Sequence, residues 1–141
     1  MKSIIEKVRE HFEADKYLMM TGVEIIEVGD NSCVCSLKIN PDLHYNAGGV
    51  VQGGVIYTLA DSAFAVASNI NYINNDEPFI MVNQSAYISY MKAGSGETLT
   101  VHAKKIGGGK KIASFQMDIT DDNCNIIATM IGNGYSVPIN K

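Results

Sequence analysis

One carboxylate, Asp61, interrupts a long apolar segment that runs from residue 54 to about residue 70 of this 141-residue chain. The segment is rich in Ala, contains no Pro and has apolar residues around most of a helical circumference, which predicts a buried helix. A carboxylate is costly to bury, and carboxylates in such places are candidates for catalysis. The alternative is an Asp that faces solvent, or one satisfied by an N-terminal segment or a second subunit.

Three residues, Gln52, Gly53 and Gly54, stand where this helix is expected to begin. The first amide N–H groups of a helix have no partner within it and lie at the positive end of its dipole, and glycine lets a ligand approach them closely. Such donors suit a carbonyl oxygen that becomes negative when its carbon is attacked. Phosphate binding is disfavoured because the Lys-Ser/Thr ending of a phosphate-binding loop is missing. A plain turn is the other interpretation.

Gly53 and Asp61 are eight positions apart in the chain. In a helix this is about 12 Å along the axis, too far for both residues to contact one carbonyl group. If they cooperate, one subunit supplies the donor and another supplies the carboxylate. We therefore expect a symmetric dimer with two sites shared across its interface.

The rest of the chain predicts elements that surround this helix. Residues 3–14 predict an amphipathic helix with Ser3 as its N-cap. Residues 22–28 and 32–39 predict two strands, and residues 40–49 predict a loop. Short turns separate four further strand-like runs, at 79–91, 98–106, 111–120 and 126–137. Short links favour antiparallel neighbours, so the expected fold class is α+β, with five to six antiparallel strands wrapped around a long central helix.

Composition limits the classes of function. The formal net charge is −4, which argues against a nucleic-acid-binding protein. No run approaches the roughly 18 apolar residues of a membrane span, and the N-terminus is too charged for a signal peptide. We expect one cytoplasmic domain, residues 1–141, with no membrane partner. Three cysteines, an odd number at a spacing typical of no common metal site, indicate reduced thiols and predict no metal centre.

The motif residues resemble a known family. Asn46, then Gln52-Gly53-Gly54, then Asp61 in a Leu-Ala-Asp sequence resembles the hotdog-fold acyl-CoA thioesterases of the phenylacetate-pathway type, in the 4-hydroxybenzoyl-CoA thioesterase superfamily. The resemblance covers essentially the whole chain and implies a hotdog fold. It implies hydrolysis of a small or medium acyl- or aryl-CoA thioester to the free acid and CoA, with no cofactor because coenzyme A is part of the substrate. It also implies a homodimer or a homotetramer built as a dimer of dimers.

The resemblance gives roles to individual residues. Asp61 is expected to be the general base, or the nucleophile, and the Gly53 amide to polarise the thioester oxygen. Asn46 is expected to position the thioester or the attacking water, and Asn83 to orient that water beside the carboxylate. A satisfied structural amide is the alternative for Asn83. The substrate is expected to contact residues that pack across the interface: Gly54, Tyr57, Phe64, Tyr87, Tyr90 and Met91.

Gln52 stands where the family motif has His. Glutamine forms hydrogen bonds but does not titrate near neutral pH. If the residue at this position only orients the loop, we expect hydrolytic activity to persist. If it stabilises charge during the reaction, we expect the activity to fall. We interpret His44, His11 and His102 as surface residues that do not replace the missing His. No Ser–His or Cys–His pairing suggests a nucleophilic triad.

A basic, glycine-rich turn is the second signal. It contains six residues that suit phosphate groups: Lys104, Lys105, Gly108, Gly109, Lys110 and Lys111. The resemblance implies that this turn lies near the nucleotide end of CoA, and we expect it to contact the phosphates. The alternative is a solvated turn whose charges protect strand edges.

Two other functions are compatible with this fold. A hotdog hydratase or dehydratase uses a His opposite the acidic residue, and the loop before the helix has none. A non-catalytic acyl-CoA-binding or regulatory protein could carry Gln52 as a mark of lost activity, but the retention of Asp61 argues against it.

Overall fold

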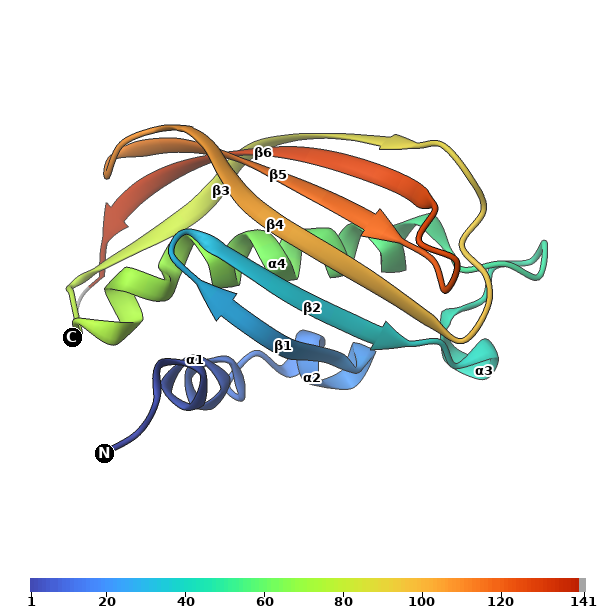
Figure 1. Cartoon of the computed structure of the whole chain (residues 1–141), viewed down its shortest axis with the longest axis horizontal. Coiled ribbons are helices and arrows are strands. Elements are labelled where there is room, and N and C mark those ends of the chain that lie inside the picture. Colours follow the sequence, from blue (N-terminus) through green and yellow to red (C-terminus); the bar gives the residue numbers. More distant parts are fainter. Residues whose placement is uncertain (140–141) are drawn as a thin grey trace.

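The structure is a computed structural model and describes residues 1–139. A six-stranded antiparallel sheet, in the order β1-β2-β4-β5-β6-β3, curves around one long helix, α4 (Gly53–Asn74; Figure 1). The strands are β1 (Val23–Gly29), β2 (Ser32–Lys38), β3 (Phe79–Tyr90), β4 (Thr98–Gly108), β5 (Ile112–Thr120) and β6 (Ile126–Pro138). Three shorter helices are α1 (Ile4–Phe12), α2 (Lys16–Thr21) and α3 (Pro41–His44). The expected α+β fold is confirmed, with six strands.

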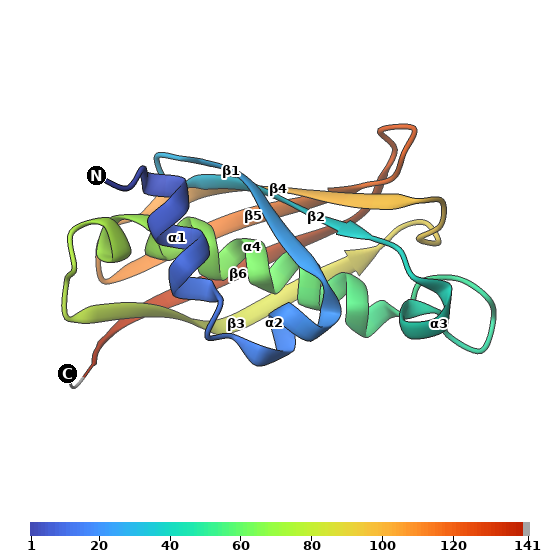
Figure 2. The ribbon, with the colours of Figure 1, turned by 90° about the horizontal axis from the view of Figure 1, so that it is seen from below.

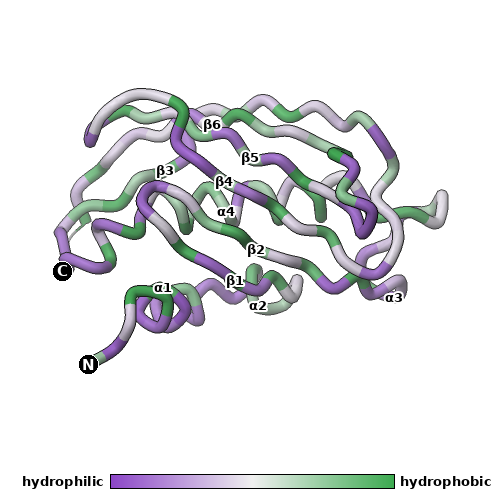
Figure 3. Tube along the Cα trace, viewed as in Figure 1, coloured by the Kyte–Doolittle hydropathy of each residue, from purple (hydrophilic) through white to green (hydrophobic). Residues whose placement is uncertain are grey.

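Alternation of apolar and polar residues explains why the sheet buries one face. In β5 the side chains of Ala113, Phe115, Met117 and Ile119 are buried, and the residues between them are partly exposed. Figure 3 shows the same alternation along β4. Because successive side chains of a strand point to opposite faces, the buried set of each strand faces α4. The buried residues of β2, β4 and β5 therefore form the core between the sheet and this helix.

The cysteines of β2 belong to this core. Cys33 and Cys35 are buried free thiols, and Cys124 is an exposed free thiol. The Cys33 thiol donates to the Ala63 carbonyl of α4 at 3.3 Å. A hydrogen bond with Cys35, together with burial, raises the pKa of the Cys33 thiol above its usual value. A thiol held in the protonated form suits packing rather than chemistry.

Helix α4 is longer than expected and begins at Gly53 rather than Gly54. It continues four residues past Ile70 because Tyr72 and Ile73 still pack against the core, and it ends at Asn74. Phe64 packs edge to face on Phe115, with ring centroids 5.5 Å apart. A Cβ atom at Gly132 or Gly134 of β6 would lie 2.9 Å from the Phe64 ring, so these two glycines make room for it.

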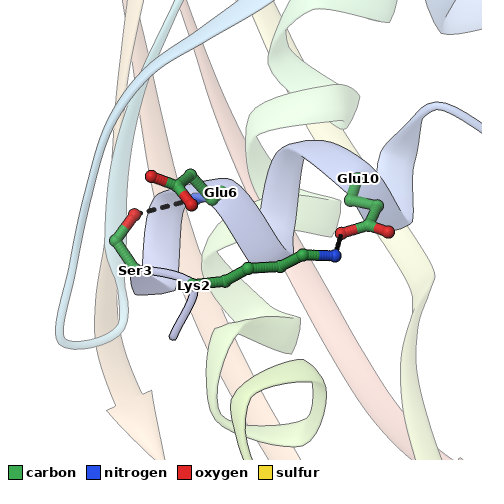
Figure 4. A network of polar contacts seen from close by, with 4 residues as sticks. All are labelled: Lys2, Ser3, Glu6 and Glu10. Atoms are coloured by element: carbon green, nitrogen blue, oxygen red, sulfur yellow. Dashed lines mark hydrogen bonds and ion pairs between the residues drawn. The ribbon is translucent and has the colours of Figure 1, made fainter.

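The N-terminal region forms two helices rather than one. Ser3 caps α1 as predicted, with its hydroxyl accepting from the Glu6 N–H at 3.3 Å, and Lys2 pairs with Glu10 (Figure 4). The hydrogen bond to Glu10 raises the pKa of the Lys2 ammonium. The second helix, α2, was not expected; Asp15 caps it by accepting from the Leu18 N–H at 3.0 Å.

The predicted loop at residues 40–49 contains the short helix α3. Asn40 caps it by accepting from the Asp42 N–H at 3.0 Å, and Pro41 occupies its first turn, where proline is favoured. Among residues 1–139, no helix has both the length and the apolar composition to cross a membrane.

The β1 edge of the sheet is covered. Helix α1 packs against β1 and α4 (Figure 2), and the Arg9 guanidinium donates from Nε and Nη2 to the Ile25 carbonyl, at 3.0 and 2.7 Å. A bulge between Ile25 and Glu27 also disturbs the pairing of β1 with β2. A covering helix, a bulge and an occupied carbonyl all protect an edge strand from pairing with another chain.

The β3 edge is closed only at its start. Asn69 of α4 accepts from the Met81 N–H at 2.8 Å and donates to the Met81 carbonyl at 3.1 Å. A bulge between Asn83 and Ser85 then shifts the register against β6. The edge groups of Met81 are therefore unavailable to another chain.

The remainder of the β3 edge is open. The Met91 N–H donates to Ile127 of β6 at 2.8 Å. The N–H and C=O groups of successive residues in an antiparallel strand point alternately to its two sides. Since those of Met91 point toward β6, those of Ala86, Ile88 and Tyr90 point away from it. Within the described residues β3 pairs with β6 alone. The N–H and C=O groups of residues 85–90 that point away from β6 are therefore unpaired. We call this segment the open edge.

Candidate active site

Asp61 lies in the third turn of α4 and is half-buried. Its Oδ1 accepts a hydrogen bond from Asn83 Nδ2 of β3 at 3.1 Å. The Oδ1 atom of Asn83 is buried and has no hydrogen-bond partner among residues 1–139. A buried acceptor left unpaired costs about 1–3 kcal/mol, so this oxygen indicates a place for a water molecule or a ligand group. The structure therefore brings together the two polar residues that the sequence suggested would be neighbours.

Asp61 belongs to a narrow strip of α4 that the sheet leaves uncovered. Gly54 and Tyr57 are exposed, and Thr58, Asp61 and Ala65 are half-buried, at steps of three and four residues that share one helix face. Burial raises the pKa of the Tyr57 hydroxyl, and the Asp61 carboxylate and Tyr90 add to the shift. Tyr57 therefore keeps its proton and can donate a hydrogen bond next to Asp61.

The start of α4 presents two free amides. Gln52 is the N-cap, and its Oε1 accepts from the Val55 N–H at 3.2 Å. The N–H groups of Gly53 and Gly54 have no acceptor among residues 1–139. A Cβ atom at Gly54 would lie 2.6 Å from Oε1 of Gln52, so a side chain at residue 54 would displace the capping oxygen. Gln52 thus caps the helix and leaves two donors at the positive end of its dipole.

A groove adjoins these amides. It has a volume of about 400 Å³, and its walls include Gly53, Ile56, Tyr90, Met91 and Lys92. The Tyr90 hydroxyl donates to the Gly53 carbonyl at 3.0 Å, which holds β3 against the start of α4. Tyr90 and Met91 were predicted at the site, whereas Lys92 was not. Its position directly after Met91 was the only sequence signal for it.

Asn46 lies outside this groove wall, in an exposed turn. Its Oδ1 accepts from the N–H groups of Gly48 at 2.9 Å and Val50 at 3.3 Å. The side-chain oxygen therefore stabilises the turn. No residue from 1 to 139 binds the side-chain Nδ2 group, which can still donate to a ligand.

The expectation that His44 is a surface residue is wrong. The side chain is 3% exposed, its Nδ1 accepts from the Asn40 N–H at 2.9 Å and its Nε2 lies 2.8 Å from the Thr21 carbonyl. With a carbonyl opposite, Nε2 carries the proton. The His44 carbonyl also accepts from the Gln52 N–H at 2.8 Å, so His44 supports the residue that caps α4. His11 and His102 are exposed, as expected.

Two residues that were predicted to contact the substrate do not line the groove at Gly53. Phe64 is 1% exposed and lies in the core. Tyr87 is 71% exposed and lies on the outer face of the sheet. The bulge after Asn83 changes which residues face the helix, so Ser85 contacts Asn133 on the outer face and Tyr87, two positions on, shares that face.

The lysine-rich turn lies at the opposite end of α4 from Gly53. Tyr72, in the last turns of α4, donates its hydroxyl to the Lys110 carbonyl at 2.9 Å. The predicted turn residues do not act as one group. Lys104 is exposed, follows the buried residue Ala103 on β4 and pairs with Gln116 of β5, so its side chain lies on the outer face of the sheet. The Gly109 N–H donates to Ile112 within the turn at 2.8 Å, so it is not free for a phosphate.

Gly108 and Lys105 have separate structural roles. Gly108 has a φ of +97°, and a Cβ atom there would lie 2.6 Å from the Ala113 Cα atom. The Lys105 N–H donates to the Asn31 carbonyl of the β1–β2 turn at 3.0 Å. Within residues 1–139, no cluster of His, Cys, Asp or Glu is arranged to hold a metal ion.

Sequence comparisons identify relatives. A family model described as the thioesterase superfamily matches residues 48–128, a span that contains Gln52, Gly53, Asp61 and Asn83. An Archaeoglobus fulgidus protein provisionally named an esterase is 31% identical over 136 residues, which are 95% of this chain and 84% of that protein. The acyl-coenzyme A thioesterase PaaI of Escherichia coli is 24% identical over 127 residues, 89% of this chain and 86% of its own length.

Solved structures share the fold. The E. coli PaaI protein from the phenylacetic acid degradation operon aligns with a TM-score of 0.85 at 21% identity, covering 97% of this chain and 96% of that one. A Streptococcus mutans protein solved with bound acetyl CoA aligns with a TM-score of 0.72 at 18% identity, covering 85% and 92%. At sequence identities this low, the similarity establishes a shared fold only.

Proposed function

Because the chain belongs to the thioesterase superfamily and is a hotdog-fold thioester hydrolase, we propose that its substrates are small or medium acyl- or aryl-CoA thioesters. The products are the free acid and CoA. Support for CoA comes from the relative named an acyl-coenzyme A thioesterase and from the neighbour that binds acetyl CoA. The observation that carries the proposal is the hydrogen bond between Asp61 and Asn83 beside an uncovered strip of α4.

The proposed chemistry is addition of water to the thioester carbonyl. The N–H groups of Gly53 and Gly54 donate to the carbonyl oxygen as it becomes negative. Asp61 takes a proton from the attacking water, and that proton then passes to the departing CoA sulfur. In the alternative course Asp61 attacks the carbonyl carbon itself and water hydrolyses the resulting anhydride. Asn83 fixes one carboxylate oxygen in both courses, and its free Oδ1 accepts from the water.

The donors and the carboxylate come from different subunits in this proposal. Eight residues of α4 separate Gly53 from Asp61, about 12 Å along the helix axis. Along β3, Tyr90 contacts Gly53 and Asn83 contacts Asp61. If two copies pair through the open edge about a two-fold axis at Tyr87, Ala86 meets Ile88 of the partner subunit. Tyr90 then lies beside Asn83 of the partner subunit, which brings each Gly53 to Asp61 of the partner subunit.

The two alternative functions have less support. A hydratase needs a titratable group opposite Asp61, but His44 uses both ring nitrogens in buried contacts and His11 and His102 are exposed on other elements. A purely regulatory protein would not need the amides of Gly53 and Gly54 to remain free. We therefore retain hydrolysis as the function of the site, with the acyl group still to be assigned.

A substrate panel tests the proposal. Purified protein is assayed against acyl- and aryl-CoA esters with a thiol reagent that detects released CoA. Asp61→Asn should lower kcat by about 100-fold or more because the base is lost. The matched control is Glu24→Gln, an exposed carboxylate on β1, which should leave kcat unchanged. Thermal unfolding establishes that both variants fold. Wild-type turnover by Asp61→Asn would remove Asp61 from the mechanism.

A further inference from the structure

The Tyr57 hydroxyl differs from its neighbours near the start of α4. The hydroxyl groups of Tyr90, Thr58 and Ser62 each donate to a backbone carbonyl of this helix, at 3.0, 2.8 and 2.6 Å. The Tyr57 hydroxyl has no hydrogen-bond partner among residues 1–139. Since a hydroxyl carries a single proton to donate, Tyr57 keeps a donor that these three neighbours have already used.

The position of Tyr57 on α4 directs its side chain at the free amides. Tyr57 follows Gly53 by four positions and Gly54 by three, so the three residues share one face of the helix. Four positions correspond to about 6 Å along the axis. A helical side chain leans toward the helix N-terminus and covers the turn before its own Cα atom. Here that turn consists of glycines, which have no side chains to obstruct the phenol.

The surroundings of Tyr57 suit a neutral donor. Burial raises the pKa of its hydroxyl, and the Asp61 carboxylate and Tyr90 add to the shift. Both groups are therefore close enough to act on the hydroxyl electrostatically, and Tyr90 is itself bonded to Gly53. The Tyr57 side chain is 36% exposed, so a bound molecule can reach it. A phenol that keeps its proton can donate to an oxygen that gains negative charge.

We propose that Tyr57 is a catalytic residue whose hydroxyl donates a hydrogen bond to the thioester oxygen, as a third donor beside the amides of Gly53 and Gly54. This inference rests on the proposed function for the reaction itself. When water adds to the carbonyl carbon, negative charge develops on that oxygen, where a preorganised donor has its largest effect. The phenol keeps its proton throughout, and the C=O bond forms again when the sulfur leaves.

This role fits the proposed sharing of the sites between subunits. If Gly53 lies beside Asp61 of the partner subunit, Tyr57, which is four positions from either residue on α4, lies beside Tyr57 of the partner subunit. The two rings would then meet near the two-fold axis. Because each side chain leans toward its own Gly53, the two hydroxyl groups serve different sites. Each site would receive two amides and a phenol from one subunit and the carboxylate from the other.

Tyr57→Phe removes the hydroxyl and keeps the ring. With an acyl-CoA substrate, kcat should fall by about 10- to 100-fold, because one donor is lost and two amides remain. KM should stay within about twofold, since the lost interaction belongs mainly to the transition state. The matched control is Tyr17→Phe, which removes the same group from a 58% exposed side chain on α2 and should leave kcat unchanged. A kcat for Tyr57→Phe within twofold of the wild type would overturn the proposal.

Infrared spectroscopy tests the contact with the oxygen directly. The probe is an acyl-CoA ketone in which a methylene group replaces the sulfur, so that it binds without being hydrolysed. Its carbonyl stretch should move to lower frequency on binding to the wild type and to Tyr17→Phe. In Tyr57→Phe, part of that shift should be lost. A fall in kcat with an unchanged carbonyl frequency would overturn the proposal, because Tyr57 would then act on another group, such as the Asp61 carboxylate.

The two measurements separate this inference from the proposed function. Hydrolysis by the wild type, with Tyr57→Phe equally active, would reject the role of Tyr57 and retain the thioesterase. Failure of the wild type to hydrolyse any thioester would reject the proposed function, and the catalytic role of Tyr57 with it. A ketone band that still depends on the Tyr57 hydroxyl would then show binding of a carbonyl group without catalysis.

Discussion

The two edges of the sheet differ in how they meet solvent. At β1, helix α1 covers the strand, a bulge disturbs it and the Arg9 guanidinium occupies the Ile25 carbonyl. At β3, residues 85–90 have no covering element, and their outward backbone groups are unpaired within the described chain. An edge with unpaired backbone groups invites another strand, and proteins normally protect such edges. The contrast supports the proposal that a second copy pairs with β3.

The location of the candidate site agrees with this contrast. Asp61 contacts Asn83 of β3, and the carbonyl of Gly53, whose amide is free, contacts Tyr90 of the same strand. None of these groups contacts β1. The protein therefore protects the edge that is remote from the site and leaves open the edge that would complete it.

Gly53→Pro gives the largest expected effect on the β3 side. Proline suits the first helical position, and the φ of −64° and ψ of 136° at Gln52 suit a residue before proline. A Cβ atom at residue 53 would lie 3.5 Å from the Tyr90 ring, an ordinary contact. The variant loses one amide donor, so kcat should fall by about 100- to 1000-fold. Gly53→Ala keeps the N–H and is the control. An active, folded Gly53→Pro enzyme would reject the proposed donor.

Ala86→Pro tests the open edge itself. The Ala86 N–H points away from β6, so proline there spares the pairing within the sheet. A two-fold interface would lose two hydrogen bonds, about 2 kcal/mol in total, which is roughly a 30-fold rise in the dimer Kd. Sedimentation equilibrium measures Kd, and activity should fall on dilution in parallel. Ala86→Ser keeps the N–H and should behave as the wild type. An unchanged Kd would place the interface elsewhere.

Arg9→Ala tests the protected edge. It leaves the buried Ile25 carbonyl without its donor, so the free energy of unfolding should fall by about 1–2 kcal/mol in denaturant titrations. The dimer Kd and kcat should not change, since β1 is remote from the site. Arg9→Lys, which cannot reproduce the two-nitrogen contact, should lose part of that stability. A weaker dimer in Arg9→Ala would reverse the roles of the two edges.

Gln52→Ala gives the smallest expected effect. Loss of the cap should lower the free energy of unfolding by about 1 kcal/mol. Because Gln52 caps α4 and does not titrate, kcat should fall by less than about tenfold. Gln52→Ser restores a capping oxygen and should recover the stability. A loss of activity as large as that of Gly53→Pro would mean that Gln52 itself stabilises charge at the thioester.

Local patterns in the sequence predicted much of this arrangement. Alternating residues identified the strands, and the apolar run with one carboxylate identified α4 and Asp61. The glycines after Gln52 identified the start of the helix. These signals depend on neighbours within a few positions, which is why they can be read without a structure.

The placements that the sequence did not predict depend on contacts between distant segments. His44 is buried because the Thr21 carbonyl, 23 positions earlier, accepts its proton. Phe64 enters the core because Gly132 and Gly134 leave space for its ring. Tyr87 faces outward because of a single bulge at Asn83 and Ser85, which inverts the alternation for the rest of β3. No local pattern marks such a bulge.

The central claim is that each site takes its carboxylate from one subunit and its amides from the other. Chains carrying Asp61→Asn and Gly53→Pro can be co-expressed with different affinity tags, and the mixed dimer can be purified with both tags. Each variant alone should be nearly inactive. The mixed dimer should regain roughly half of the wild-type kcat, because one of its two shared sites is intact. A mixed dimer as inactive as its parents would show that Asp61 and Gly53 do not act across subunits.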